Sequence, residues 1–265
     1  MRRRAALGTF VLTALLLGCA TAPPVLQANE EVRRSLAPTG TLRIAVFTGS
    51  PMSMVRDAAS GRTLGVAYEL GTALAARLGV PHQLVEFGTF ADVAAALASG
   101  QADIGMFNAS SPRASEVWLA PTLLSQEASY LVPGTSSIMA IADVDKPGVR
   151  VGVQQNSSSQ GLLARTLKSA TLVPLPNLQN VPQMFAAGQL GAFATNKGIL
   201  FDLSDRVPAS RILEGSYAIE NQTLAIPKGR EAGGAYLAKF LDEARSSGLV
   251  KASAERARLR GVLFR

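Results

Sequence analysis

A polar segment at residues 108–113 (NASSPR) follows an apolar run that is typical of a buried strand. It contains small hydroxyl side chains, an amide, a proline suited to the first turn of a helix, and one arginine. Hydroxyls, free backbone N–H groups and a guanidinium fork are the donors that bind a carboxylate. The segment is therefore interpreted as half of a carboxylate-binding site. A serine helix cap beside a surface arginine is the alternative interpretation.

A second polar segment of the same kind lies at residues 152–161 (GVQQNSSSQG). Asn156, Ser157 and Ser158 precede a predicted helix, where they can cap it or offer N–H donors to an anion. A plain helix cap is again the alternative. Two such segments in different parts of the chain favour a shared cleft.

Both segments follow strands in two similar runs of alternating strands and helices. The first run predicts strands at 41–47, 82–87 and 102–107 and helices at 66–79 and 90–100. The second run predicts strands at 148–153, 171–175 and 192–195 and helices at 158–169 and 178–188. Such alternation indicates an α/β fold with parallel sheets, whose ligands bind at the carboxyl ends of the strands. Residues 231–248 predict a further amphipathic helix, with a short one after it.

The first 18 residues indicate an export signal, because arginines precede an apolar stretch too short to cross a bilayer. The stretch ends in LLGC, and Cys19 is the only cysteine in the chain. This pattern resembles a bacterial lipoprotein signal, in which Cys19 carries the lipid that anchors the protein to a membrane. An ordinary signal peptide is the alternative. Residues 19–40 are interpreted as a tether with a short helix at 30–36.

The composition indicates a packed globular protein, because 48% of the 265 residues are hydrophobic and 17% are charged. The net charge of +7 includes three arginines of the signal, and no basic–aromatic pattern suggests nucleic acid. His82, the only histidine, is far from both polar segments in sequence. No phosphate loop or dinucleotide motif is found, so we expect no cofactor, no metal ion and no catalytic residues.

Residues 41 to about 255 resemble the periplasmic solute-binding proteins of ABC importers (family 3), in the branch that takes polar amino acids. The stretches that carry the resemblance are LRIAVF, GVAYELGTALAARLGV, FADVAAALASGQADIG, NASSPRASEVWLAP, VRVGVQQNSSS, AAGQLGAFATN and LAIPKG. The resemblance implies a two-lobed periplasmic-binding-protein-like fold of type II, each lobe having a mostly parallel sheet flanked by helices. Lobe 1 is expected at 41–123 plus 222–265 and lobe 2 at 124–221. Hinge crossings are expected near 123–127 and 218–222.

The resemblance also implies ligand-binding residues in the first lobe. Asn108, Ser110 and Arg113 occupy a family pattern of Thr-x-Thr-x-x-Arg, in which the arginine holds the carboxylate of the ligand. Phe47 and Phe107 are candidates for the apolar wall of the cleft, with a plain core position as the alternative.

In the second lobe, Asn156, Ser157 and Ser158 stand where the family has a Gly-Thr/Ser-Thr run, and the glycine is missing. Asn196 stands where the family has an aspartate that holds the α-ammonium group. An amide supplies no full charge, so we expect weaker binding of amino acids, and a ligand without an amine becomes plausible.

These features predict a monomeric, membrane-anchored periplasmic protein that captures a small carboxylate-bearing solute, an amino acid or a related organic acid. The protein would deliver this solute to the membrane permease of an ABC transporter. A ligand sensor for a receptor is one alternative. A dehydratase on the same fold is another, since some relatives act on cyclohexadienyl substrates. That reaction needs a general acid in the cleft, and neither polar segment contains Asp, Glu or His.

Overall fold

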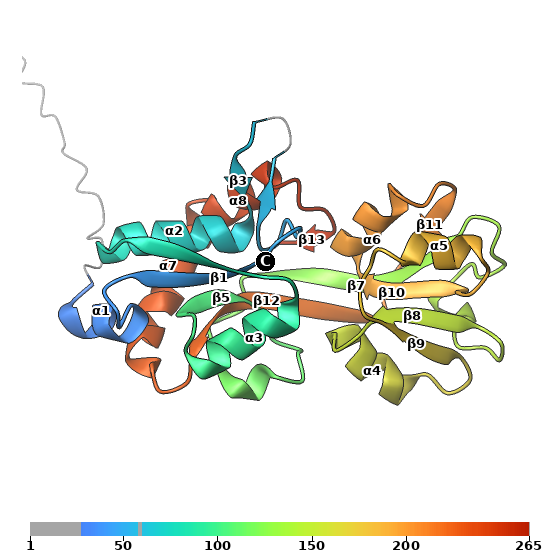
Figure 1. Cartoon of the computed structure of the whole chain (residues 1–265), viewed down its shortest axis with the longest axis horizontal. Helices are drawn as coiled ribbons and strands as arrows, with labels where there is room; N and C mark the ends of the chain where they lie inside the picture. Colours follow the sequence, from blue (N-terminus) through green and yellow to red (C-terminus); the bar gives the residue numbers. More distant parts are fainter. Residues whose placement is uncertain (1–27, 58–59, 265) are drawn as a thin grey trace, which may run out of the picture.

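The computed structural model describes residues 28–57 and 60–264 (Figure 1). The predicted signal at 1–18, Cys19 and the first part of the tether lie outside the described residues. The helices are α1 (Glu30–Leu36), α2 (Val66–Leu78), α3 (Phe90–Ser99), α4 (Ser158–Thr166), α5 (Val181–Ala186), α6 (Lys197–Ser204), α7 (Gly234–Ser246) and α8 (Leu249–Arg256). Within the described ranges, none of the helices is both long and apolar enough to span a membrane.

The longer strands are β1 (Leu42–Phe47), β4 (His82–Phe87), β5 (Ile104–Asn108), β7 (Leu124–Pro133), β8 (Arg150–Gln154), β9 (Thr171–Leu175), β10 (Ala192–Asn196) and β12 (Ala218–Pro227). The short strands are β2 (Val55–Arg56), β3 (Thr63–Leu64), β6 (Val117–Leu119), β11 (Ser210–Ile212) and β13 (Val262–Leu263). Each strand and helix expected from the two alternating runs is present, with ends shifted by a few residues.

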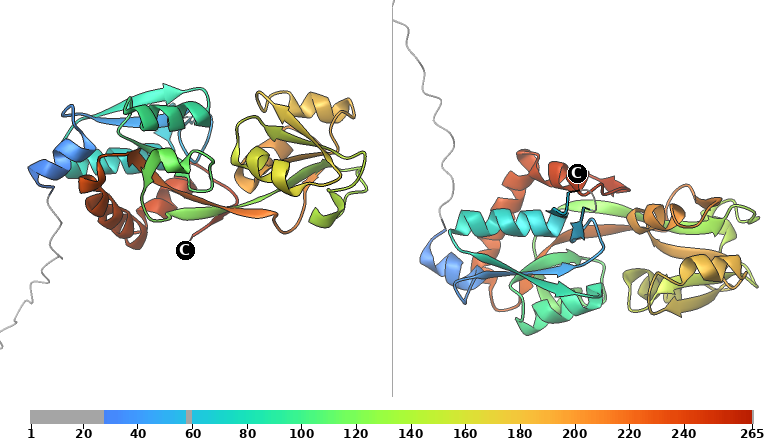
Figure 2. Two further views of the ribbon diagram at one scale, coloured as in Figure 1. Left: turned by 90° about the horizontal axis from the view of Figure 1, so that it is seen from below. Right: turned by 45° about the horizontal axis from the view of Figure 1, so that its top comes forward.

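One continuous sheet runs through both halves of the molecule, in the order β4-β1-β5-β12-β7-β10-β8-β9. At one end β4, β1 and β5 are parallel, and at the other end β10, β8 and β9 are parallel. The strands β12 and β7 lie between these parallel groups and pair with each other in antiparallel fashion. Figures 1 and 2 show two α/β lobes joined through these long strands.

The core of the first lobe follows the alternation of side chains along β1. Leu42, Ile44 and Val46 pack with α2, α7 and α8 on one face of the sheet, whereas Ala45 packs with α3 on the other. Helix α2 contributes Leu70, Leu74 and Leu78 to the first of these clusters and ends at Gly79, whose φ of 69° is the left-handed conformation of a helix C-cap.

The second lobe has the same two-faced core. Alternate residues of β10 face opposite sides, so that Ala192 and Ala194 pack on the α4 side and Phe193 packs on the side of α5 and α6. Each parallel sheet is therefore covered by helices on both faces, as the alternating pattern predicts.

Strands β7 and β12 pass between the lobes side by side. Residues 124–128 of β7 pair with residues 218–222 of β12. The hinge expected near 123–127 and 218–222 falls on these paired strands and stays a prediction. The C-terminal strand β13 also pairs with β7, at Gln126 and Ser125. Helix α1, in the predicted tether, packs beside α7 with Leu36 fully buried.

Candidate functional site

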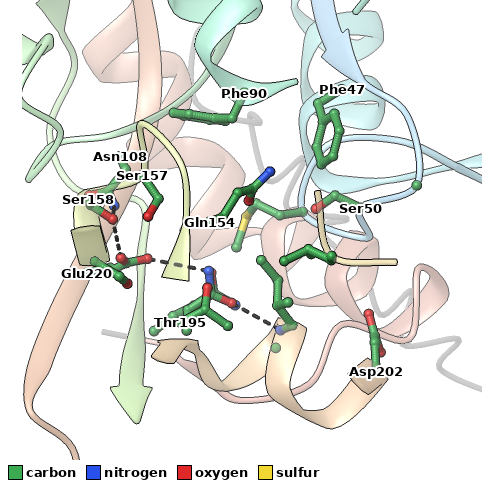
Figure 3. Close-up of a pocket in the computed structure, with 18 of the residues that line it drawn as sticks. Phe47, Ser50, Phe90, Asn108, Gln154, Ser157, Ser158, Thr195, Asp202 and Glu220 are labelled. Atoms are coloured by element: carbon green, nitrogen blue, oxygen red, sulfur yellow. Dashed lines mark hydrogen bonds between the residues drawn. The ribbon is translucent and has the colours of Figure 1, made fainter. Parts of the chain in front are cut away.

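A cavity of about 610 Å³ lies between the two lobes. The first lobe lines it with Phe47, Ser50, Met52, Phe90, Asn108 and Ser111, and the second lobe with residues 154–159, Thr195, Asn196 and Asp202. Gln126, Glu220 and Gln222 complete the wall from the paired strands β7 and β12. Figure 3 shows side chains from both lobes directed into this space. Of the residues expected to bind ligand, the cavity brings together Phe47, Asn108, Asn156, Ser157, Ser158 and Asn196.

The N-terminus of α4 forms one wall of the cavity. The side chain of Ser157 caps this helix by accepting a hydrogen bond from the N–H of Gln160 at 3.1 Å. Asn156 has a φ of 60°, a left-handed conformation that favours glycine and that asparagine also tolerates. The residue that stands in place of the family glycine thus adopts a backbone conformation typical of glycine.

Asn196 ends β10 and caps α6. Its Oδ1 accepts a hydrogen bond from the N–H of Ile199 at 3.1 Å, and its Nδ2 donates to Glu220 Oε2 at 3.4 Å. Both the oxygen and the nitrogen of the Asn196 amide therefore form hydrogen bonds within the protein.

Asn108 connects the two lobes. It is buried at the end of β5, where its Oδ1 accepts a hydrogen bond from the N–H of Ser110 at 2.8 Å. Its Nδ2 donates across the cavity to Ser158 Oγ at 3.1 Å. Ser111 lines the cavity, whereas Ser110 is not among the lining residues.

Arg113 is also outside the lining of the cavity. Its Nε and Nη2 donate to the carboxylate of Glu116 at 3.0 and 2.7 Å, and its Nη1 donates to the backbone oxygen of Ala91 at 3.1 Å. The hydrogen bonds from Arg113 hold the pKa of Glu116 below its usual value. Because Ala91 lines the cavity, the guanidinium of Arg113 lies beside the site. Each of its three nitrogen atoms already donates a hydrogen bond within the protein. Its expected role in holding a ligand carboxylate stays a prediction.

The two phenylalanines expected in the apolar wall have different positions. Phe47 lines the cavity, whereas Phe107 is fully buried in the core between β5 and α3. Phe107 packs against Phe90, with ring centroids 5.7 Å apart, and Phe90 is the aromatic ring that lines the cavity there.

Glu220 is a site residue that the sequence analysis did not identify. It lies on β12, 6% exposed, and lines the cavity between the lobes. Ser158 Oγ donates to its Oε1 at 2.5 Å (Figure 3). Burial raises the pKa of Glu220, while hydrogen bonds from Ser158, Asn196 and Asn108 oppose the shift. The two polar segments contain no acidic residue, but Glu220 of β12 provides a carboxyl group in the cleft.

One signal for Glu220 was present in the sequence. In the segment AIENQTLAIP, Glu220 and Gln222 alternate with Asn221, which is the period of a strand. Both alternate residues are buried, and β12 pairs them with Gln126 and Leu124 of β7. Buried polar side chains on a strand that passes from one lobe to the other indicate a site between the lobes.

Other charged groups near the cavity are held by groups of the protein. Arg260 bridges Asp202 of α6 and Asp205 at its C-cap at 2.8 and 2.6 Å. Arg206, which also lines the cavity, donates from its Nε to the backbone oxygen of Asp202 at 3.2 Å. Lys197 bridges Glu127 of β7 at 2.5 Å. Across the described part of the chain, no group of three or more His, Cys, Asp or Glu side chains could hold a metal ion.

Comparison with known proteins identifies the group to which this architecture corresponds. The model of the bacterial extracellular solute-binding proteins, family 3, matches residues 42–257. No curated protein matches the chain in sequence.

Solved structures match the fold over most of its length. A substrate-binding protein of an amino acid ABC transporter from Streptococcus pneumoniae, bound to L-arginine, has a TM-score of 0.71 and 19% identity, over 84% of this chain and 97% of that chain. A solute receptor for L-cysteine from Neisseria gonorrhoeae has a TM-score of 0.72 and 19% identity, over 86% and 92%. An ancestral amino acid-binding protein, a precursor of cyclohexadienyl dehydratase, has a TM-score of 0.67 and 23% identity, over 83% and 95%. These matches confirm the periplasmic-binding-protein fold.

Proposed function

Because the chain belongs to family 3 of the bacterial extracellular solute-binding proteins, we propose that it captures a small carboxylate-bearing solute, an amino acid or related organic acid, and delivers it to an ABC permease. The observation that carries this proposal is the cavity between the lobes, whose walls come from both lobes and from the strands that join them. A ligand in such a cavity contacts both lobes at once, so its binding energy favours a closed arrangement.

The chemistry of the cavity suits a carboxylate. The N-terminus of α4 carries a partial positive charge and lies beside hydroxyl groups of Ser157 and Ser158. Arg113 is our candidate for the charged partner, because a carboxylate in the cavity can compete with Glu116 for its guanidinium. The amino acids named for the similar structures, L-arginine and L-cysteine, support an amino acid as the first class to test.

We place the bending of the protein in β7 and β12, between lobes at 41–123 plus 222–265 and at 124–221. Both strands are ten residues long, and their paired segments at 124–128 and 218–222 lie at the proposed boundary. A change of backbone angles in these few residues rotates one lobe against the other without disturbing either core.

A thermal-shift screen of a variant that begins after Cys19 tests the proposed binding. The panel holds the common L-amino acids, dicarboxylates, keto acids and sulfonates. A ligand at 100 times its dissociation constant stabilises the protein by about 2.7 kcal/mol, which raises the midpoint on the order of 5–10 °C for a chain of this size. Absence of any shift across the panel would contradict the proposal.

The lipid anchor at Cys19 is part of the same proposal. We expect the full chain expressed in a Gram-negative host to fractionate with membranes and to be released by Cys19→Ser. Recovery of the unchanged protein in the soluble periplasmic fraction would instead indicate an ordinary signal peptide. A permease gene beside this gene would support transport, and a sensor kinase gene would support the receptor alternative.

Glu220 gives the dehydratase alternative a specific basis, because a buried carboxyl group with a raised pKa can serve as a general acid. Incubation with a cyclohexadienyl substrate tests this alternative. Turnover that is lost in Glu220→Gln would favour the enzyme. We favour binding because the family model that matches residues 42–257 describes solute-binding proteins.

A further inference from the structure

Glu220 is a buried carboxylate that has no charged partner of its own. Its hydrogen bonds come from the hydroxyl of Ser158 and the amides of Asn196 and Asn108, which are neutral donors. Within residues 28–57 and 60–264, no lysine, arginine or histidine forms an ion pair with it. An ionised carboxylate in such a position is costly unless a positive charge compensates it.

The carboxylate also has unused capacity to accept hydrogen bonds. Two carboxylate oxygens offer about four acceptor positions, and the side chains of Ser158, Asn196 and Asn108 do not fill all of them. Because Glu220 lines the cavity, a bound solute can reach the carboxylate and use this remaining capacity.

Nearby cations of the protein are held elsewhere. Lys197 is paired with Glu127, and Arg113 with Glu116. Arg260 is paired with Asp202, which Figure 3 shows on the opposite side of the cavity from Glu220. A metal ion is a poor alternative, because the described residues provide no cluster of three or more acidic, histidine or cysteine ligands.

We propose that Glu220 is the subsite for a positively charged nitrogen of the captured solute, an ammonium or a guanidinium group. This inference rests on the proposed binding function. The nitrogen donates to the free positions of the carboxylate and compensates its charge, while Ser158 and Asn196 hold the carboxylate in place.

This assignment changes the expected class of ligand. The amide at Asn196 suggested a solute without an amine, since it supplies no charge of its own. In the structure the amide of Asn196 donates a hydrogen bond to Glu220. The negative charge that Asn196 lacks is therefore supplied by the adjacent side chain of Glu220. The preferred solute therefore carries both a carboxylate and a cationic nitrogen.

The test compares matched ligands on matched variants. Dissociation constants are measured by calorimetry for L-amino acids, for the corresponding α-hydroxy acids, which lack the amine, and for putrescine and agmatine, which lack the carboxylate. The proteins are the wild type, Glu220→Gln and Glu214→Gln. The last removes a negative charge at an exposed position that does not line the cavity.

We expect an L-amino acid to bind the wild type, with its hydroxy acid bound at least about tenfold more weakly. In Glu220→Gln the amino acid loses about 10- to 100-fold in affinity, and the preference over the hydroxy acid disappears. Glu214→Gln keeps the preference. Circular dichroism and the unfolding midpoint verify that each variant is folded.

The other outcomes separate the two proposals. Hydroxy acids that bind as well as amino acids, or an unchanged preference in Glu220→Gln, would overturn the ammonium subsite and leave carboxylate capture in place. Binding of putrescine or agmatine alone, lost in Glu220→Gln, would support the subsite and contradict carboxylate capture. No binding of any of these compounds to the folded wild type would overturn both.

Discussion

Ser158 and Glu220 are joined by a hydrogen bond of 2.5 Å between the first residue of α4 and the strand β12. The same hydroxyl accepts a hydrogen bond from Asn108 of β5 at 3.1 Å. One serine thus links the first lobe, the second lobe and a strand that joins them. A solute that binds at this point meets all three parts of the molecule.

Ser158→Ala removes a donor from the buried carboxylate of Glu220. We expect it to destabilise the ligand-free protein by about 1–3 kcal/mol when Glu220 is ionised, because a buried charge then lacks a hydrogen bond. The loss decreases as the pH falls and Glu220 is protonated. Urea unfolding at several pH values measures this effect.

Ser157→Ala is the matched control for that variant. It removes the cap of α4, at a cost of about 1 kcal/mol, without touching Glu220. Its cost should not vary with pH in the range where Glu220 titrates. A cost for Ser158→Ala that is equally independent of pH would contradict the predicted role of the hydroxyl.

The pH dependence of stability provides a second test of Glu220. Burial raises its pKa in the folded protein, so the folded state holds the proton more tightly than the unfolded chain. The resulting stabilisation is complete below the unfolded pKa of about 4.3 and is lost as the pH rises through the folded pKa. We therefore expect the stability of the wild type relative to Glu220→Gln to fall with rising pH.

Thermal unfolding of both proteins between about pH 4 and pH 9 measures the difference. Tyr130 and Tyr217, whose rings pack against each other, do not interfere, because burial raises the pKa of Tyr130 to about 12 and also raises that of Tyr217. Parallel curves for the two proteins would show that the pKa of Glu220 is the same in both states.

Much of the fold could be predicted from local patterns. The apolar run of β1 and the helical spacing of Leu70, Leu74 and Leu78 are set by nearby residues and by the burial that each face requires. The strands β2, β3 and β13 were not predicted, because two residues carry no periodicity. Their conformation depends on the strands with which they pair, such as β7 for β13.

The site was less predictable than the fold. The polar residues at the ends of β5 and β8 could be recognised because they follow buried strands. The environment of Glu220 depends on the pairing of β12 with β7 and on the N-termini of α4 and α6, which lie beside it. These contacts join distant parts of the sequence, so no short stretch of it predicts them. The position of Arg113 had a visible signal, since Glu116 follows three residues later on the short helix at Ala114–Glu116.

Asn156 provides a test of the loop before α4. Its φ of 60° costs a β-branched residue about 1–2 kcal/mol, whereas glycine adopts this conformation freely. We expect Asn156→Val to lower the free energy of unfolding by that amount and Asn156→Gly to be close to neutral. Urea denaturation checks both, and equal losses for the two variants would contradict this account.

Arg113 and Glu116 test how the ligand carboxylate is held. In the ligand-free protein both guanidinium edges that could form a fork are occupied, by Glu116 and by the backbone oxygen of Ala91. If the guanidinium turns to the ligand on closure, Glu116 competes with the ligand carboxylate. Glu116→Gln should then raise the affinity for a carboxylate ligand, and Arg113→Ala should lower it by about tenfold or more.

Calorimetry with the ligand found in the screen distinguishes the two roles of the arginine. The pair is on the surface, with side chains 37% and 41% exposed, so neither change should unfold the protein. A ligand that binds all three proteins equally would show that the carboxylate is held by the N-terminus of α4 and its serines alone. A loss of about tenfold or more in Arg113→Ala together with a gain in Glu116→Gln supports a direct bond from the guanidinium to the ligand carboxylate, since the loss of one screened surface charge changes the affinity by less.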